Sequence, residues 1–280
     1  NLQLKMKRDC LTGEALRHIT SLSNYVSELA NVPPLNSRPF VGRSAFAHKG
    51  GVHVSAVVKN PAAYEHIRPE RVGNKQRVLV SDLAGKSNIE YKARELGVDL
   101  GLDKATTKRI VREIKKMEDQ GYQFDAAEGS LSLLIKKKTG AFKDPFNLES
   151  YHVLITKRGN EPPTAQASIK ISVGDEQEVT AAEGNGPINA LDNALRKALT
   201  KFYPQLNEMH LVDFKVRIVE GSEGTAAVVK VLLDTKDEEE VWGTIGVSEN
   251  VIEASWHALV DSVQYKLSRD RLNINKLGSR

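Results

Sequence analysis

The chain has 280 residues, 40% of them hydrophobic and 27% charged, which is ordinary for a soluble globular protein and enough for two domains with separate cores. Its formal net charge of +4 is spread along both halves without the aromatic platforms of a nucleic-acid-binding motif, and no hydrophobic run reaches the roughly 20 residues that a bilayer requires, so neither nucleic acid nor a membrane is an expected partner. The single cysteine, Cys10, excludes an intrachain disulfide, and no signal-peptide pattern is present, so we expect a cytoplasmic protein.

The first 80 residues indicate small helices joined by loops. Hydrophobic residues recur at helical spacing over residues 14–30, and the Asn-Val-Pro-Pro run that follows ends that helix. After a glycine-rich stretch, residues 52–59 predict a short helix. Asn60 and Pro61 then end it and begin another, with Asn60 as the N-cap and Pro61 at the first helical position.

Residues 81–138 predict further small helices, separated by glycines. The clearest is 104–120, whose hydrophobic residues form one stripe: Ile110, Val111, Ile114 and Met117. Composition changes at about residue 139, and the polar run over 139–150 is typical of a linker.

The remainder mixes strands with two long helices. Alternation over 167–173 predicts a strand, and further strands are expected at 212–219 and 226–233. Helices are expected at 187–203 and 251–267.

The last part of the chain also contains an internal repeat. The segment Gly186-Pro187-Ile188-Asn189-Ala190, with Ala194-Leu195, aligns with Asn250-Val251-Ile252-Glu253-Ala254, with Ala258-Leu259, 64 positions later. A strand with a central lysine, Lys170 or Lys230, precedes each helix. This indicates a duplicated β-β-β-α unit that would also suit dimerisation, the alternative being chance similarity between two amphipathic helices.

The sequence therefore predicts an α+β fold in three parts. Residues 1–80 form a first linker subdomain, residues 81–148 a helical second one, and residues 149–280 the duplicated domain. Because the chain opens on Asn-Leu-Gln-Leu, we expect a piece of a longer protein.

The most unusual cluster of side chains is His48, Gly50, Gly51, His53 and Tyr64. Two histidines five apart lie about 140° apart around a helix, which is a poor arrangement for a shared metal. A histidine changes charge near pH ~6.5 and a tyrosine phenol near pH ~10, so His53 suits proton transfer and Tyr64 suits hydrogen bonding to a developing oxyanion. The alternative is that both are ordinary, partly buried polar residues.

A second candidate site is the start of the helix at Pro187. Gly184 and Gly186 would let a ligand approach the backbone closely, and a helix N-terminus suits the carboxylate of an amino acid. The matching helix has Asn250 and Glu253, a capping-box-like pair that would satisfy its own N–H groups, whereas the first helix lacks a side-chain cap. The alternative is that Gly186 simply caps a helix.

Residues 42–67, GRSAFAHKGGVHVSAVVKNPAAYEHI, followed by Pro69-Glu70 and Val72-Gly73, resemble the linker of the α-isopropylmalate, homocitrate and citramalate synthase family, and most of all its citramalate branch. Residues 1–6 resemble the end of the family's catalytic (β/α)₈ barrel. The turn at 184–187 and the helix entry at 246–248 resemble its regulatory domain.

The resemblance implies an acyltransferase that condenses acetyl-CoA with a 2-oxo acid and then hydrolyses the thioester. In the citramalate branch the oxo acid is pyruvate, and the pathway leads to isoleucine. It implies that a divalent metal is held by the missing barrel and not by this chain, and that the protein is a homodimer. His53 and Tyr64 match the histidine and tyrosine that reach over the partner's barrel, whereas His48 would only organise the glycine loop. Without the barrel we expect this chain to be inactive.

The resemblance also implies an effector pocket, lined by Gly184, Gly186, Ile188, Asn189, Ile218, Thr225 and Ala227. Isoleucine is the expected effector; leucine would be expected of an isopropylmalate synthase, which takes 2-oxoisovalerate. One methyl position distinguishes the two amino acids, worth only ~1–3 kcal/mol of binding energy. A third interpretation is a stand-alone amino-acid-binding and dimerisation module.

Overall fold

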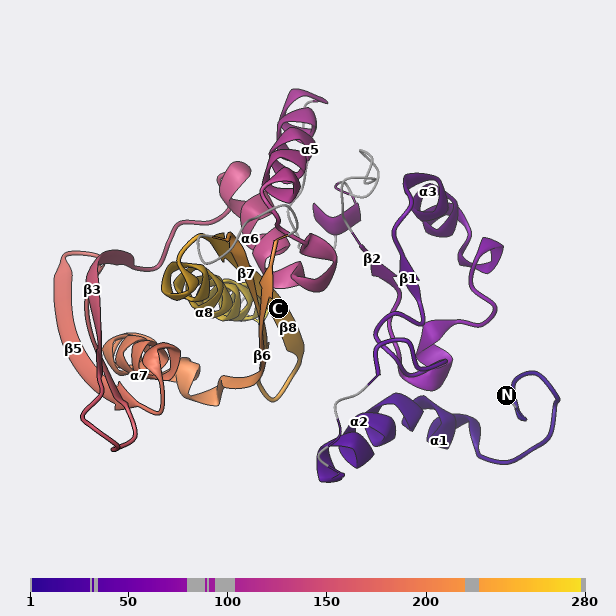
Figure 1. Cartoon of the computed structure of the whole chain (residues 1–280). Helices are drawn as coiled ribbons and strands as arrows, with labels where there is room; N and C mark the ends of the chain where they lie inside the picture. Colours follow the sequence, from indigo (N-terminus) through magenta and orange to yellow (C-terminus); the bar gives the residue numbers. More distant parts are fainter. Residues whose placement is uncertain are drawn as a thin grey trace. The chain divides into compact units, whose positions relative to one another are not determined.

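The computed structural model describes residues 2–30, 32, 35–79, 89, 91–93, 104–219 and 227–277. The chain forms two compact units, Asn1–Glu95 and Leu96–Arg280 (Figure 1). Among the helices so described, none is both long enough and apolar enough to cross a bilayer.

The N-terminal unit begins with two helices, α1 (Gly13–Arg17) and α2 (Ile19–Leu29). The Thr12 side chain caps α1 by accepting from the Ala15 N–H at 3.1 Å, and the chain leaves helical geometry at His18. The single helix predicted over 14–30 is therefore two helices with a break at His18.

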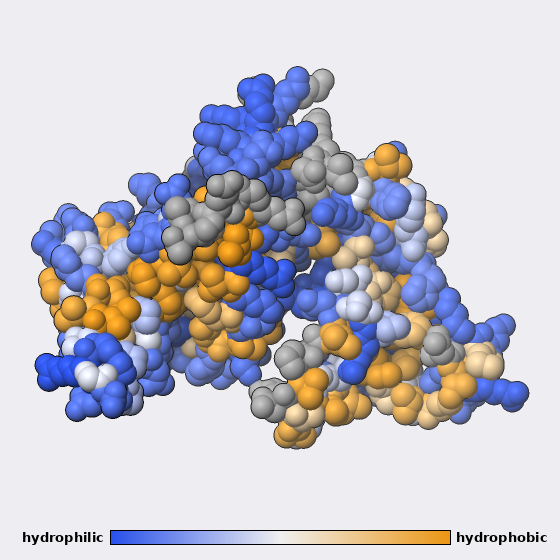
Figure 2. All heavy atoms as spheres, in the orientation of Figure 1, coloured by the Kyte–Doolittle hydropathy of each residue, from blue (hydrophilic) through white to orange (hydrophobic). Residues whose placement is uncertain are grey.

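A small scaffold follows α2. It consists of β1 (Ala47–His48), α3 (Gly51–Lys59), η1 (Pro61–Ala63), η2 (Pro69–Val72) and β2 (Arg77–Val78). The two short strands pair in parallel, Ala47 opposite Arg77 and His48 opposite Val78. Leu16, Phe46 and Val72 form the buried centre. By contrast the outer stripe of α2 (Leu22, Tyr25, Val26 and Leu29) is exposed, in the hydrophobic surface that Figure 2 shows over that helix.

The C-terminal unit opens with α5 (Lys104–Asp119), η3 (Phe124–Ala126) and α6 (Glu128–Lys138). The helix predicted over 104–120 is confirmed, and its stripe is buried at Ile110 and Ile114. The predicted linker is too long, because the first strand of the next sheet begins within it, at Asn147.

Two β-β-β-α units complete the chain, as predicted. The first consists of β3 (Asn147–Thr156), β4 (Thr164–Val173), β5 (Glu176–Gly184) and α7 (Pro187–Leu199). After η4 (Pro204–Glu208), the second consists of β6 (His210–Ile218), β7 (Val229–Lys236), β8 (Val241–Ser248) and α8 (Val251–Leu277). Each unit makes an antiparallel three-stranded sheet in sequence order. The α+β prediction is confirmed.

The repeat extends to single hydrogen bonds. The Thr180 hydroxyl on β5 donates to the Ala194 carbonyl on α7 at 2.8 Å, and the Thr244 hydroxyl on β8 donates to the Ala258 carbonyl on α8 at 2.8 Å. Both members of the second pair lie 64 positions after those of the first. Lys170 lies in β4 and Lys230 in β7, so a strand with a lysine does precede each helix, but the offset of 64 aligns Lys170 with Asp234 and not with Lys230.

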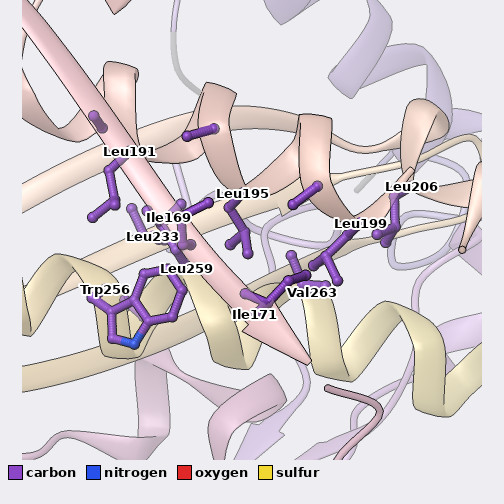
Figure 3. Packing of buried hydrophobic residues seen from close by; sticks show 14 of the residues in the cluster. Ile169, Ile171, Leu191, Leu195, Leu199, Leu206, Leu233, Trp256, Leu259 and Val263 are labelled. Carbon is purple, nitrogen blue, oxygen red and sulfur yellow. The ribbon is translucent and has the colours of Figure 1, made fainter. Parts of the chain in front are cut away.

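The two repeats share one core, part of which Figure 3 shows. Leu191, Leu195 and Leu199 of α7 pack on Ile169 and Ile171 of β4, and the same cluster includes Leu233, Trp256, Leu259 and Val263 of the second repeat. Complete burial of such a side chain contributes about 1.5–3 kcal/mol. The repeats are therefore halves of one domain.

Candidate functional site

Local sequence signals shape the segment that carries the candidate catalytic residues. Gly50 precedes α3 in an extended conformation, which puts His53 in the first turn of the helix. The Asn60 side chain accepts from the Ala62 N–H at 3.2 Å, and Pro61 takes the first position of η1. The predicted restart at Asn60 and Pro61 is confirmed, as a single turn that ends at Tyr64.

The turn brings the two candidate catalytic side chains together. The rings of His53 and Tyr64 lie 4.4 Å apart between centroids, with a tilt of 31°. Both residues are exposed, whereas Val54 and Val57 of α3 are completely buried. Val54 and Val57 thus pack α3 into the unit. On the exposed side of the helix, the His53 imidazole lies beside the phenol of Tyr64, which follows η1.

A third and a fourth side chain complete the cluster. The His48 ring lies 6.5 Å from the Tyr64 ring, nearly edge-on, and its Nε2 lies 3.2 Å from Oε1 of Glu65. The His48 and Glu65 side chains are only 10% and 3% exposed. Glu65 was not among the predicted site residues, because the segment from Asn60 to Glu65 lacks the periodicity that distinguishes a buried carboxylate from a solvated one.

This cluster suits proton transfer rather than metal binding. A neutral imidazole accepts a proton and a phenol donates a hydrogen bond, and here the two are adjacent and open to a substrate. Over the residues that the structure describes, no group of three or more His, Cys, Asp or Glu side chains could hold an ion. His48 and Glu65 are hydrogen-bonded to each other and form only a pair, which is too few ligands for a divalent metal.

The predicted effector residues fall into two groups in different repeats. Gly184, Gly186, Ile188 and Asn189 lie where β5 passes into α7, whereas Ile218 ends β6 and Ala227 lies buried before β7. Thr225 lies outside the described residues. A hollow of about 350 Å³ beside α7 is lined by other residues, which include Asp192, Arg196 and Met209. The effector pocket therefore stays a prediction.

The two glycines of the first group differ in their surroundings. A Cβ on Gly184 would lie 2.3 Å from the Ala190 backbone nitrogen, so close helix packing accounts for that glycine. Gly186 has open space around it and gives α7 no side-chain cap. Of the two, only Gly186 leaves room for a ligand.

The start of α8 differs from that of α7. The Asn250 side chain accepts from the Ile252 N–H at 2.8 Å and from the Glu253 N–H at 3.4 Å. Glu253 does not complete the predicted capping box; its carboxylate accepts a hydrogen bond from Tyr151 and lies 3.1 Å from His257. The contrast predicted between the helix starts, one capped and one not, is confirmed.

Two protein-family models match the sequence of this chain. The homocitrate synthase post-HMGL domain-like family model matches residues 40–122, and the LeuA allosteric (dimerisation) domain model matches residues 125–267, about half of the chain. The chain belongs to the α-isopropylmalate, homocitrate and citramalate synthase family, as the resemblance implied.

Its relatives within the family are named (R)-citramalate synthase. The chain is 53% identical to that of Aquifex aeolicus over 271 residues, 51% identical to that of Geobacter sulfurreducens over 269 residues, and 38% identical to that of Sulfolobus acidocaldarius over 273 residues. These alignments cover 96%, 96% and 97% of this chain, but only 51%, 51% and 50% of the relatives. The chain thus spans about half the length of the relatives that it matches.

Proposed function

We propose that this chain is the active-site lid and amino-acid-sensing part of an enzyme that condenses acetyl-CoA with pyruvate to (R)-citramalate, on the route to isoleucine. The observation that carries the proposal is the exposed ring pair of His53 and Tyr64, 4.4 Å apart on the α3–η1 turn. The names of the relatives support the choice of reaction. The cytoplasm stays the expected location.

In the proposed reaction, His53 removes a proton from the methyl group of the acetyl thioester. The enolate carbon then forms a bond to the keto carbon of pyruvate, and Tyr64 donates a hydrogen bond to an oxygen that gains negative charge. Water cleaves the thioester and releases free CoA. The divalent metal that the resemblance implies would be held by residues in the half of the relatives that this chain does not span, so this chain alone should be inactive.

The direct test is turnover by the full-length enzyme with His53 replaced. We expect His53→Ala to lower kcat by about a hundredfold or more, because general acid–base groups contribute factors of about 10²–10⁴. His152→Ala, which changes an exposed histidine on β3, serves as the matched control. Near-normal kcat in a folded His53→Ala enzyme would contradict the catalytic role.

The substrate needs a second assay. Pyruvate and 2-oxoisovalerate are compared as acceptors for acetyl-CoA in the full-length enzyme, and we expect a clear preference for pyruvate. A preference for 2-oxoisovalerate would make this an isopropylmalate synthase. No condensation with either acceptor would favour the stand-alone binding module.

We further propose that the C-terminal domain binds isoleucine as a feedback effector. The support is the uncapped start of α7 at Gly186, whose N–H groups and positive dipole end suit a carboxylate. Calorimetric titration of the chain with isoleucine, leucine and valine tests it. Selective binding of leucine would contradict the assignment, and no binding to folded protein would remove the pocket.

Finally, we propose that the protein is a homodimer in which a second copy covers β6. Phe214 pairs with Leu233 of β7, and Val216 pairs with Val231. Residues directly opposite each other lie on the same face of a sheet, and Leu233 and Val231 are buried on the face that the helices cover, so Phe214 and Val216 lie on that face too. Val216 is nevertheless 44% exposed, and Ile218, next on the same face, 63%. The matching family model describes a dimerisation domain, which suits this surface.

A further inference from the structure

The two segments that carry His53 and Tyr64 are tied together by one buried contact. His48 lies at the end of β1, five residues before His53, and Glu65 directly follows Tyr64. Nε2 of His48 lies 3.2 Å from Oε1 of Glu65. Because a carboxylate can only accept, the imidazole donates, and Nε2 carries the hydrogen. The contact thus joins the residue before the glycine loop to the residue after the phenol.

Each member of this pair is held by the backbone of the scaffold. The Leu79 N–H donates to the His48 carbonyl at 2.9 Å, which fixes His48 in the parallel pairing of β1 with β2. The Glu65 N–H donates to the Pro61 carbonyl at 2.9 Å, which fixes Glu65 in the η1 turn. The side-chain contact therefore connects β1 with the η1 turn, and backbone hydrogen bonds hold both of its residues in place.

Burial makes the contact specific. A carboxylate that is 3% exposed is costly unless it is paired, and its partner His48 is itself only 10% exposed. A displacement of η1 from β1 would leave Glu65 buried without that partner. Since Tyr64 is the neighbouring residue, its backbone cannot move away from α3 without the same penalty.

We propose that His48 and Glu65 are positioning residues that hold Tyr64 against His53. This rests on the proposed function of His53 and Tyr64. The pair lies inside the unit, whereas His53 and Tyr64 lie on its surface, so the pair acts through the tyrosine and does not touch the reacting atoms. A shift of about 1 Å in a catalytic group lowers turnover by up to about a hundredfold, which sets the size of the effect.

The first experiment needs no activity. In the 280-residue chain with isotopically labelled histidine and tyrosine, the rings of His53 and Tyr64 should give a nuclear Overhauser cross-peak. We expect Glu65→Ala and His48→Phe to abolish this cross-peak and Glu65→Gln, which still accepts from His48, to keep it. Glu70→Gln changes an exposed carboxylate five residues away and is the matched control.

The second experiment measures kcat and KM of the full-length enzyme with the same substitutions. We expect Glu65→Ala to lower kcat about ten- to a hundredfold with KM nearly unchanged, and Glu65→Gln to restore most of the loss. A folded Glu65→Ala or His48→Phe chain with an intact cross-peak would overturn the positioning role. If Glu65→Ala does not fold, His48→Phe decides. Failure of the proposed function is distinguishable from failure of the positioning role. Normal turnover in the His53→Ala enzyme would contradict the catalytic role of His53, whereas the cross-peak in the Glu65 and His48 variants reports only whether the two rings stay together.

Discussion

The two β-β-β-α repeats have the same strand order, the same bulge in the first strand and the same threonine-to-helix hydrogen bond. They differ in what covers their first strands. Tyr151 of β3 packs against Trp256 of α8 with ring centroids 5.6 Å apart, and its hydroxyl donates to Glu253. Burial and the Glu253 carboxylate raise the pKa of Tyr151 to about 12.

The second repeat has no matching cover among the described residues. Phe214 on β6 pairs with Leu233 as Tyr151 pairs with Ile169 on β4, and these two partners are 64 positions apart. Yet α7 does not cover β6 as α8 covers β3, and Phe214 stays 37% exposed. The two repeats therefore share an internal hydrogen bond, whereas among the described residues one hydrophobic strand face of the second repeat stays exposed.

The largest expected effect is on assembly. Val216→Glu places a charge in the centre of the uncovered face, and an unpaired buried charge should raise the dimer dissociation constant by about a hundredfold or more. Sedimentation velocity of the chain measures it. Arg217→Glu, on the next residue and the opposite face of β6, is the control and should stay dimeric. A Val216→Glu protein that remains a dimer would place the interface elsewhere.

The shared hydrogen bond gives a test of equivalence. Thr180→Val and Thr244→Val each remove a buried donor to a helix carbonyl, and each should cost about 1–2 kcal/mol of unfolding free energy. Urea denaturation of the chain measures both, with Thr164→Val, an exposed threonine of β4, as the control. Because one core joins the repeats, the two losses should be similar. A loss confined to one variant would mean that the repeats are not energetically equivalent.

A half-buried residue on α8, Asp261, gives a pH-dependent test. Burial raises the pKa of Asp261 from 3.8 to about 6, although a hydrogen bond from Ser130 and the charge of Lys137 oppose the shift. The folded state then binds more protons than the unfolded state between about pH 3.8 and pH 6, so stability falls as pH rises through that range.

Asp261→Asn should abolish this slope and stabilise the chain at pH 7 by on the order of 1–2 kcal/mol. Thermal unfolding at a series of pH values measures it, and Asp175→Asn, in the exposed turn between β4 and β5, is the control. An unchanged slope in the Asp261→Asn chain would mean that Asp261 does not titrate in this range.

Periodicity and repetition were sufficient to predict the duplication, the α+β class and the helices that the structure has at Lys104–Asp119 and Pro187–Leu199, because each depends on contacts that recur along the sequence. The predicted end of the second helix, at residue 203, was four residues too late. The contact between His48 and Glu65 could not be predicted in this way. It joins the end of β1 to a residue that follows η1, and neither segment has a repeating pattern. The role of Glu253 was missed for a similar reason, because its partner Tyr151 lies 102 positions away.

The smallest expected effect concerns the helix starts. Asn250→Ala removes the cap of α8 and should cost about 1 kcal/mol. Gly186→Asn adds a side chain in open space at the start of α7, where the backbone is extended and accepts any residue, and should gain a few tenths of a kcal/mol. Urea denaturation measures both.

The same two variants also test ligand binding. If the N–H groups of α7 bind the isoleucine carboxylate, Gly186→Asn should weaken isoleucine binding severalfold in calorimetry, while Asn250→Ala should leave it unchanged. Equal affinities in the two variants would mean that the uncapped start of α7 does not bind the ligand. The missing cap would then affect only the stability of the helix.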